Sequence, residues 1–117
     1  MINTLNLVEG DLNRIHKNIK KSNTIKKIIV IFACFIGYAE FRAIFLYRLS
    51  HIFLGKKYIY PFTLFLQRLL SPIEIDPNAV IGAGLHFPHP QGIVIGSVKI
   101  GRNVSVYQGV TIGVRRG

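Results

Sequence analysis

Apolar residues recur at helical spacing through the first 72 residues of the chain, where glycine is scarce. A recurrence every three or four positions places apolar side chains on one face of a helix, and the first such series is Leu5, Val8, Leu12, Ile15 and Ile19. A second helix is expected over residues 25–54 with a bend near Gly37, and a third over 62–70, between two prolines. Residues 1–72 are therefore predicted to form a helical N-terminal region.

From residue 73 onward the apolar period changes to six. Two rows keep this period in step: one contains Val94, Ile100, Val106 and Ile112, and the other Val98, Val104 and Val110. Neither an α-helix nor a flat alternating strand repeats every six residues. The hexapeptide repeat of a β-helix does, because each six residues form a short strand and a turn. We expect the recurring aliphatic position to point inward in about two coils over residues 73–117, with an ordinary antiparallel sheet as the alternative.

The six-residue rhythm is interrupted once. From Ile81 to Val94 the distance is thirteen residues, one more than two repeats, and the segment "HFPHPQ" over residues 86–91 fills the gap. A loop or site is expected where a regular repeat is interrupted. Two prolines stiffen this loop, and its two histidines, His86 and His89, are the candidate functional residues.

The chain is strongly basic, with fifteen Lys and Arg against five Asp and Glu and a formal net charge of +10. This excess of positive charge is typical of proteins with an anionic partner, such as nucleic acid, an anionic membrane surface or a phosphorylated ligand. The alternative is that the basic residues only form a solvated surface. The glycine-rich half lacks interleaved aromatic and basic residues, a zinc pattern and a recognition helix, so no nucleic-acid partner is expected. Peripheral membrane contact through the basic N-terminal helix, with its lysines and the apolar run that follows, remains open.

The single cysteine, Cys34, lies within an apolar run and is predicted to be a buried, reduced thiol. A reducing compartment follows weakly from this, and the N-terminus lacks the pattern of a secretory signal. The apolar run over residues 28–39 is shorter than the roughly twenty residues of a membrane-spanning helix. We expect a buried or interfacial helix there, and a cytoplasmic protein, with the inner membrane face as the peripheral alternative.

Residues 75–113, "IDPNAVIGAGLHFPHPQGIVIGSVKIGRNVSVYQGVTIG", resemble the left-handed β-helix of the serine acetyltransferase family. The resemblance is carried by the places of Pro77, Ile81-Gly82, His89, "GIVIG" at 92–96 and "QGVTIG" at 108–113. The segment "FLYRLSHIFL" at 45–54 also resembles the last helical segment of the family before its β-helix. The resemblance implies an α+β fold, in which the helical region over 1–72 is followed by the first coils of a left-handed parallel β-helix over 73–117. It also implies homotrimers with active sites between adjacent prisms.

The same resemblance implies transfer of an acetyl group from the co-substrate acetyl-CoA to a hydroxyl, L-serine in cysteine biosynthesis being the reaction of the family. His89 falls on the catalytic histidine and would act as general base. Glu74 falls on the carboxylate that orients this histidine, and His86 is a candidate contact for the acceptor substrate. No metal is expected, because His86 and His89 have no third ligand nearby in the sequence.

Two departures from the family pattern matter for function. Pro88 stands where the metabolic enzymes carry an aspartate that helps to hold the amino group of serine, so a sugar hydroxyl of a capsule or exopolysaccharide is the alternative acceptor. The family also has a second active-site histidine and its CoA groove on later coils. We therefore expect the chain to be the front part of a longer enzyme, with an inactive truncated remnant as the alternative.

Overall fold

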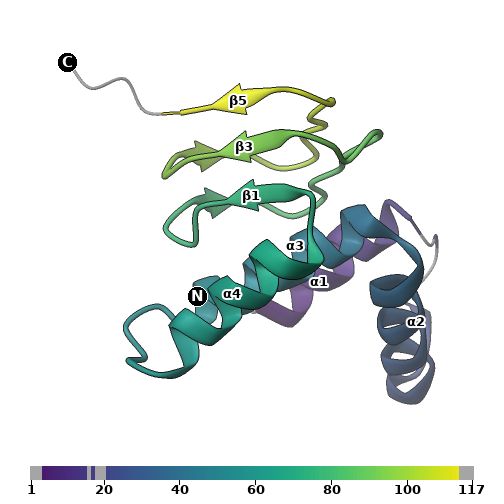
Figure 1. Cartoon of the computed structure of the whole chain (residues 1–117). Coiled ribbons are helices and arrows are strands. Elements are labelled where there is room, and N and C mark those ends of the chain that lie inside the picture. Colours follow the sequence, from purple (N-terminus) through teal and green to yellow (C-terminus); the bar gives the residue numbers. More distant parts are fainter. Residues whose placement is uncertain (1–3, 16, 18–20, 114–117) are drawn as a thin grey trace.

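The computed structural model describes residues 4–15, 17 and 21–113. In these ranges the chain forms four α-helices and five short strands, which are α1 (Thr4–Asn13), α2 (Thr24–Gly37), α3 (Ala39–Ile52), α4 (Ile59–Leu70), β1 (Ile73–Ile75), β2 (Val80–Ile81), β3 (Ile93–Ile95), β4 (Lys99–Ile100) and β5 (Thr111–Ile112). The helices form a base, and the strands lie above it one over another (Figure 1).

Helix α1 is shorter than the sequence predicts. It ends at Asn13, Ile15 lies in the turn that follows, and Ile19 is outside the described residues. The predicted apolar face is confirmed at Val8 and Leu12, which are buried with Cys34 and Phe41 in a cluster that joins three helices. Ile15 packs against the same cluster and is partly buried. Cys34 is thus buried as predicted, and burial raises the pKa of its thiol.

The long helix predicted over residues 25–54 is two helices, α2 and α3, bent by 114° at the break between them. Asn23 caps the start of α2, accepting a hydrogen bond from the backbone N–H of Lys26 at 2.8 Å. Tyr38, directly after Gly37, adopts an extended backbone that ends α2 and begins α3. In the described part of the chain no single helix is long and apolar enough to cross a membrane; α2 and α3 would pass by length and composition only as a bent pair.

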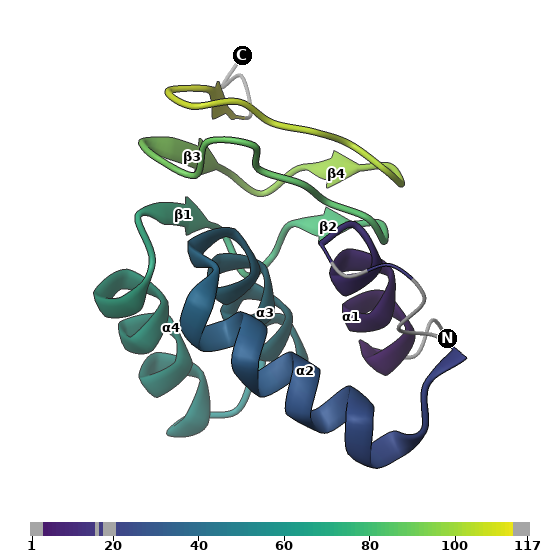
Figure 2. The ribbon, with the colours of Figure 1, turned by 90° about the vertical axis from the view of Figure 1, so that its right-hand side faces the viewer.

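The strands pair in parallel, which excludes the antiparallel alternative. Strands β1, β3 and β5 form one sheet in that order, and β2 and β4 form a second. A parallel bridge between His86 and Ser105 adds a third line of pairing. The chain thus runs through a first layer (residues 73–92) and a second layer (93–110) before β5 begins a third. In Figure 2, β1 and β3 lie above α4, whereas β2 and β4 lie above α1.

The inward-facing row differs from the predicted one at Val94. Ile93 and Ile95 are buried, whereas Val94 between them is 38% exposed. His86 pairs with Ser105 and Val94 with Thr111, so the first layer uses eight positions where the second uses six. The loop therefore holds two extra residues rather than one. Since successive side chains of a strand alternate between faces, this difference of one residue turns Val94 outward.

The main core lies between α3 and the inner face of the layers. It contains side chains of α3, of the first layer and of the second layer: Ala43, Ile44, Tyr47, Ile73, Ile75, Ala79, Ile81, Leu85, Phe87, Ile93, Ile95 and Val106. Ile100 and Ile112 of the predicted row pack against this core from the layers above. The layers are therefore held to the helical base by apolar contact as well as by the hydrogen bonds described next.

Side chains of the helical base cap the lower edge of the first layer. The backbone carbonyls of this edge have no strand below them, and an unpaired buried carbonyl is costly. Four side chains pair with them: Gln67 with Ile75 O (3.1 Å), His51 with Pro77 O (2.7 Å), Tyr47 with Ala79 O, and Arg48 with Ile81 O and Gly82 O (2.6 and 2.9 Å). We call this set the edge cap, and it closes a sheet edge that would otherwise be open.

The buried ion pair between Asp11 of α1 and Arg48 of α3 completes the edge cap. Arg48 Nε and Nη2 donate to the two carboxylate oxygens of Asp11 at 3.0 and 3.1 Å. One of these oxygens also accepts from the backbone N–H groups of Gly84 and Leu85 at 3.0 and 3.1 Å. Burial raises the pKa of Asp11, while Arg48 and the two N–H groups act against this rise.

Candidate active site

His89 lies at the surface, in the loop that connects the first layer to β3. The backbone N–H of Gln91 donates to His89 O at 2.8 Å, which makes a tight turn, and Gly109 N in turn donates to Gln91 O at 3.0 Å. The imidazole lines a shallow hollow of about 290 Å³ together with Pro90, Gln91 and Gln108. In Figure 1 this loop stands out beyond the stacked layers. The two extra residues of the first layer thus present His89 to solvent, where a substrate can reach it.

His86, at the start of the same loop, is held by a residue that the sequence did not indicate. Its Nδ1 lies 2.9 Å from Oε2 of Glu40, in the first turn of α3, and the contact is an ion pair when the imidazole is protonated. The same oxygen accepts a hydrogen bond from the backbone N–H of Phe87 at 3.1 Å. Glu40 therefore ties the His89 loop to the helical base through the N–H of Phe87, while Nδ1 of His86 lies beside the same carboxylate without a hydrogen bond in the described part of the chain.

Glu74 occupies the middle of β1, with its side chain turned outward and 64% exposed. Its nearest charged neighbour is Arg68 of α4, whose Nε lies 3.9 Å from Oε1. Within the described residues no hydrogen bond or ion pair joins Glu74 to His89, and the two line different hollows. A single copy of the chain therefore does not assemble the predicted pair of base and orienting carboxylate.

The larger hollow, of about 310 Å³, lies between α4 and the first two layers. Charged side chains of both signs line it, with Arg68 on α4 facing Glu74 and Asp76 on the layer side. Gln67 forms part of its wall and donates to Ile75 O, while its own Oε1 is buried without a partner in the described part of the chain. The hollow is thus lined by charge of both signs.

Among the residues that the structure describes, no three side chains of His, Cys, Asp or Glu are grouped so as to hold a metal ion.

Replacing Glu40 with alanine is expected to loosen the His89 loop. The change removes the acceptor of Phe87 N–H and the neighbour of His86, and hydrogen bonds to a charged group contribute about 1.5–3 kcal/mol. We expect faster hydrogen exchange of the Phe87 amide and a loss of that order in the free energy of unfolding. Glu74→Ala is the matched control, because that carboxylate is exposed, and equal effects of both changes would contradict the anchoring role.

Comparison with known proteins places this geometry in context. No family model matches the chain. Among curated proteins, the serine acetyltransferase of Staphylococcus xylosus is 33% identical over 122 aligned positions, covering 97% of this chain and 51% of the relative. The serine acetyltransferase of Bacillus subtilis is 38% identical over 85 residues, covering 70% of this chain and 39% of the relative. The chain thus spans about half of the length of these relatives, or less.

Solved structures of serine acetyltransferases are also similar to this chain. A serine acetyltransferase of Neisseria gonorrhoeae in complex with serine aligns with a TM-score of 0.72 and 27% identity, over 97% of this chain and 46% of that one. Soybean serine acetyltransferase complexed with serine aligns with a TM-score of 0.68 and 26% identity, over 92% of this chain and 43% of that one. The similarity therefore includes both the helical base and the parallel layers.

Proposed function

We propose that this chain, which is similar to serine acetyltransferases in sequence and in fold over nearly its whole length, carries part of the active site of an enzyme that transfers an acetyl group from acetyl-CoA to the hydroxyl of L-serine. The observation that carries the proposal is the similarity over 97% of the chain to a curated serine acetyltransferase. The loop insertion that exposes His89 lies within the region that resembles the catalytic segment of the family, which adds local support.

In the same proposal, the parallel layers are the first coils of a left-handed β-helix, and residues 1–72 and 73–117 are its helical and β-helical parts. Three parallel lines of pairing and their stacking above the helices support this architecture. The two structures complexed with serine support a small-molecule acceptor. A homotrimer is part of the proposal as well, and it would place an active site between adjacent copies.

His89 is the general base in the proposed reaction. Its neutral imidazole takes the proton from the acceptor hydroxyl while the hydroxyl oxygen bonds to the thioester carbonyl carbon of acetyl-CoA. The C–S bond then breaks, the acetyl ester of the acceptor forms, and the sulfur leaves as CoA, taking up the proton from the imidazolium. The positively charged surface of the chain suits the phosphates of CoA.

Glu74 is proposed to orient His89 across a contact between copies. Within one copy these residues line different hollows, and Glu74 is exposed on the outer face of β1. A site shared by two copies brings together side chains that one copy holds apart. A carboxylate that accepts from the ring N–H fixes the tautomer of the base and stabilises the imidazolium.

L-Serine is the acceptor that we propose, although Pro88 cannot bind an ammonium group. The relatives and structures reported above are named serine acetyltransferases, and they give no support to a capsule or exopolysaccharide acceptor. In this protein, a residue other than Pro88 must therefore bind the ammonium group of serine.

The test is release of free CoA thiol by the product of the complete gene, with acetyl-CoA and either L-serine or a sugar alcohol as acceptor. We expect turnover with L-serine, because the relatives are named as acetyltransferases of serine. Turnover with the sugar alcohol but not with L-serine would refute the acceptor, and absence of thiol release with either would refute the acetyl transfer.

A further inference from the structure

One face of α2 is apolar and open to solvent. Its members lie on one side of the helix, are between 60% and 71% exposed, and are Ile25, Ile28, Ile29, Phe32 and Ile36. We call them the α2 outer face. The opposite side of the same helix packs against α1 and α3 through Val30, Ile31, Cys34 and Phe35. The helix therefore has a buried side that holds it in place and an apolar side that no other described part of the chain covers.

Helix α2 projects away from the layers. It is bent by 114° from α3, and in Figures 1 and 2 it forms the lower end of the molecule, away from the strands. A flat surface can therefore approach the α2 outer face without meeting the layers or the His89 loop.

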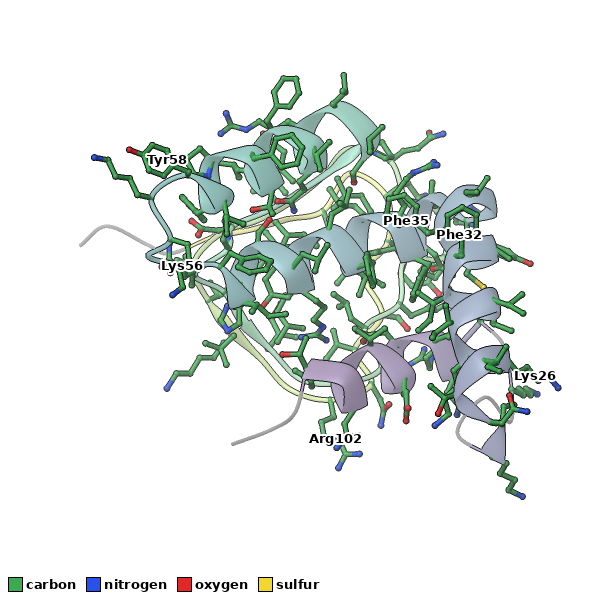
Figure 3. The ribbon with its side chains drawn as sticks, turned by 90° about the horizontal axis from the view of Figure 1, so that it is seen from below. Lys26, Phe32, Phe35, Lys56, Tyr58 and Arg102 are labelled. Atoms are coloured by element: carbon green, nitrogen blue, oxygen red, sulfur yellow. The ribbon has the colours of Figure 1, made fainter. Side chains whose placement is uncertain are left out.

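The start of α2 is basic. Lys21 and Lys26 are exposed at this end, and Lys17 is exposed shortly before it. Lys27 differs from them, because its ammonium group pairs with Glu9 at 2.8 Å. Seen from below, Lys26 points away from the other helices (Figure 3). The α2 sequence contains no acidic residue, so the apolar face is accompanied by positive charge alone.

We propose that the α2 outer face docks onto an anionic lipid surface. An interfacial helix buries its apolar face at the boundary of headgroups and acyl chains, while lysines beside it meet anionic headgroups. A second copy of the chain offers little complementary charge. Four of the five carboxylates already have a partner within their own chain, with the pairs Glu9–Lys27, Asp11–Arg48, Glu40–Phe87 N and Asp76–Asn78 N. The fifth, Glu74, lies on β1, which stands above α4 (Figure 2).

The sequence leaves open a membrane contact through the basic N-terminal helix and the apolar run that follows it, and the structure favours the second part of that surface. Val8 and Leu12 of α1 are buried in the helical cluster. These two side chains therefore cannot contact a lipid surface. The contact falls instead on α2, which the sequence predicted as a buried or interfacial helix.

The experiment is co-sedimentation of the protein with vesicles of phosphatidylcholine, with and without phosphatidylglycerol. We expect binding to the anionic vesicles that weakens at high salt, and little binding to the neutral ones. The double variant Ile28→Asn/Phe32→Asn removes two exposed apolar side chains, and its partition coefficient should fall by at least about tenfold. Lys21→Glu/Lys26→Glu should cause a loss of similar size on anionic vesicles.

Helix α4 provides the matched control. Phe62 and Phe65 are about as exposed as Phe32, and Phe62→Asn/Phe65→Asn should leave vesicle binding within about twofold. Equal losses in both double variants, or equal binding to neutral and anionic vesicles, would overturn the proposal. So would a lower molar mass of Ile28→Asn/Phe32→Asn in sedimentation equilibrium, because the α2 outer face would then join two copies. Release of CoA thiol should be the same in all these variants, which separates this proposal from that of acetyl transfer.

Discussion

Alanine in place of His89 is expected to lower the rate of the proposed acetyl transfer by about 10²- to 10⁴-fold, the usual contribution of a positioned general base. The hydroxyl of an acceptor is a weak nucleophile, and without the imidazole its proton has no base within reach in the hollow formed with Pro90, Gln91 and Gln108. The rate is measured as release of free CoA thiol with L-serine. Because His89 is exposed and its side chain has no hydrogen bond in the described part of the chain, the free energy of unfolding should not change.

Gln91→Ala is the control for this variant. Gln91 is exposed and lines the same hollow, but its side-chain amide has no basic group to accept a proton. The control should keep its rate within about threefold, since it alters the shape of the hollow only. If His89→Ala retained most of the rate, the assignment of His89 as base would be wrong, whereas a large loss in both variants would point to a role of the loop shape.

Replacing Arg48 with methionine is expected to destabilise the protein by about 3–5 kcal/mol, as breaking one partner of a buried ion pair does elsewhere. The change leaves the Asp11 carboxylate buried without a counter-ion and removes the donors to Ile81 O and Gly82 O. Methionine matches the arginine stem in length, so the loss is one of polar contacts rather than of packing. The measurement is equilibrium unfolding in urea, followed by circular dichroism.

Lys27→Met is the matched control, since it breaks the less buried pair between Lys27 and Glu9. That change should cost less than about 1 kcal/mol. Asp11→Asn serves as a second, milder variant, because the amide keeps one oxygen for Gly84 N and Leu85 N but loses the charge that faces Arg48. A loss for Arg48→Met no larger than the loss of about 1 kcal/mol expected for Lys27→Met would show that the edge cap contributes little to stability.

The sequence predicts the elements better than their register. Helical spacing indicates the helices, and the bend near Gly37 is confirmed by the break before Tyr38. The change to a six-residue period indicates the parallel layers. The length of an interrupting loop leaves no such periodic signal. The sequence predicts one residue more than two repeats, whereas the structure has two extra residues in the loop, and the inward position predicted for Val94 is wrong for this reason.

Of the residues at the site, some are indicated by the sequence and others only by the structure. His89 is found from its place in a motif, and its position on an exposed loop agrees with that use. The role of Glu40 depends on a contact with Phe87 N across 47 residues of sequence, which no local pattern indicates. Asp11 did carry a signal, because a carboxylate lies between Val8 and Leu12 on an otherwise apolar helix face and needs a buried partner.

The edge cap has a consequence for the order in which the protein assembles. The helices that supply Tyr47, Arg48 and His51 leave the ribosome before the first layer does, because they precede it in the chain. Ile75 then pairs with Ile95, and Ile95 with Ile112, so each new strand finds its neighbour about twenty residues behind it. Folding can thus follow synthesis from one end, and the lower edge is never offered to a neighbouring nascent chain as a template.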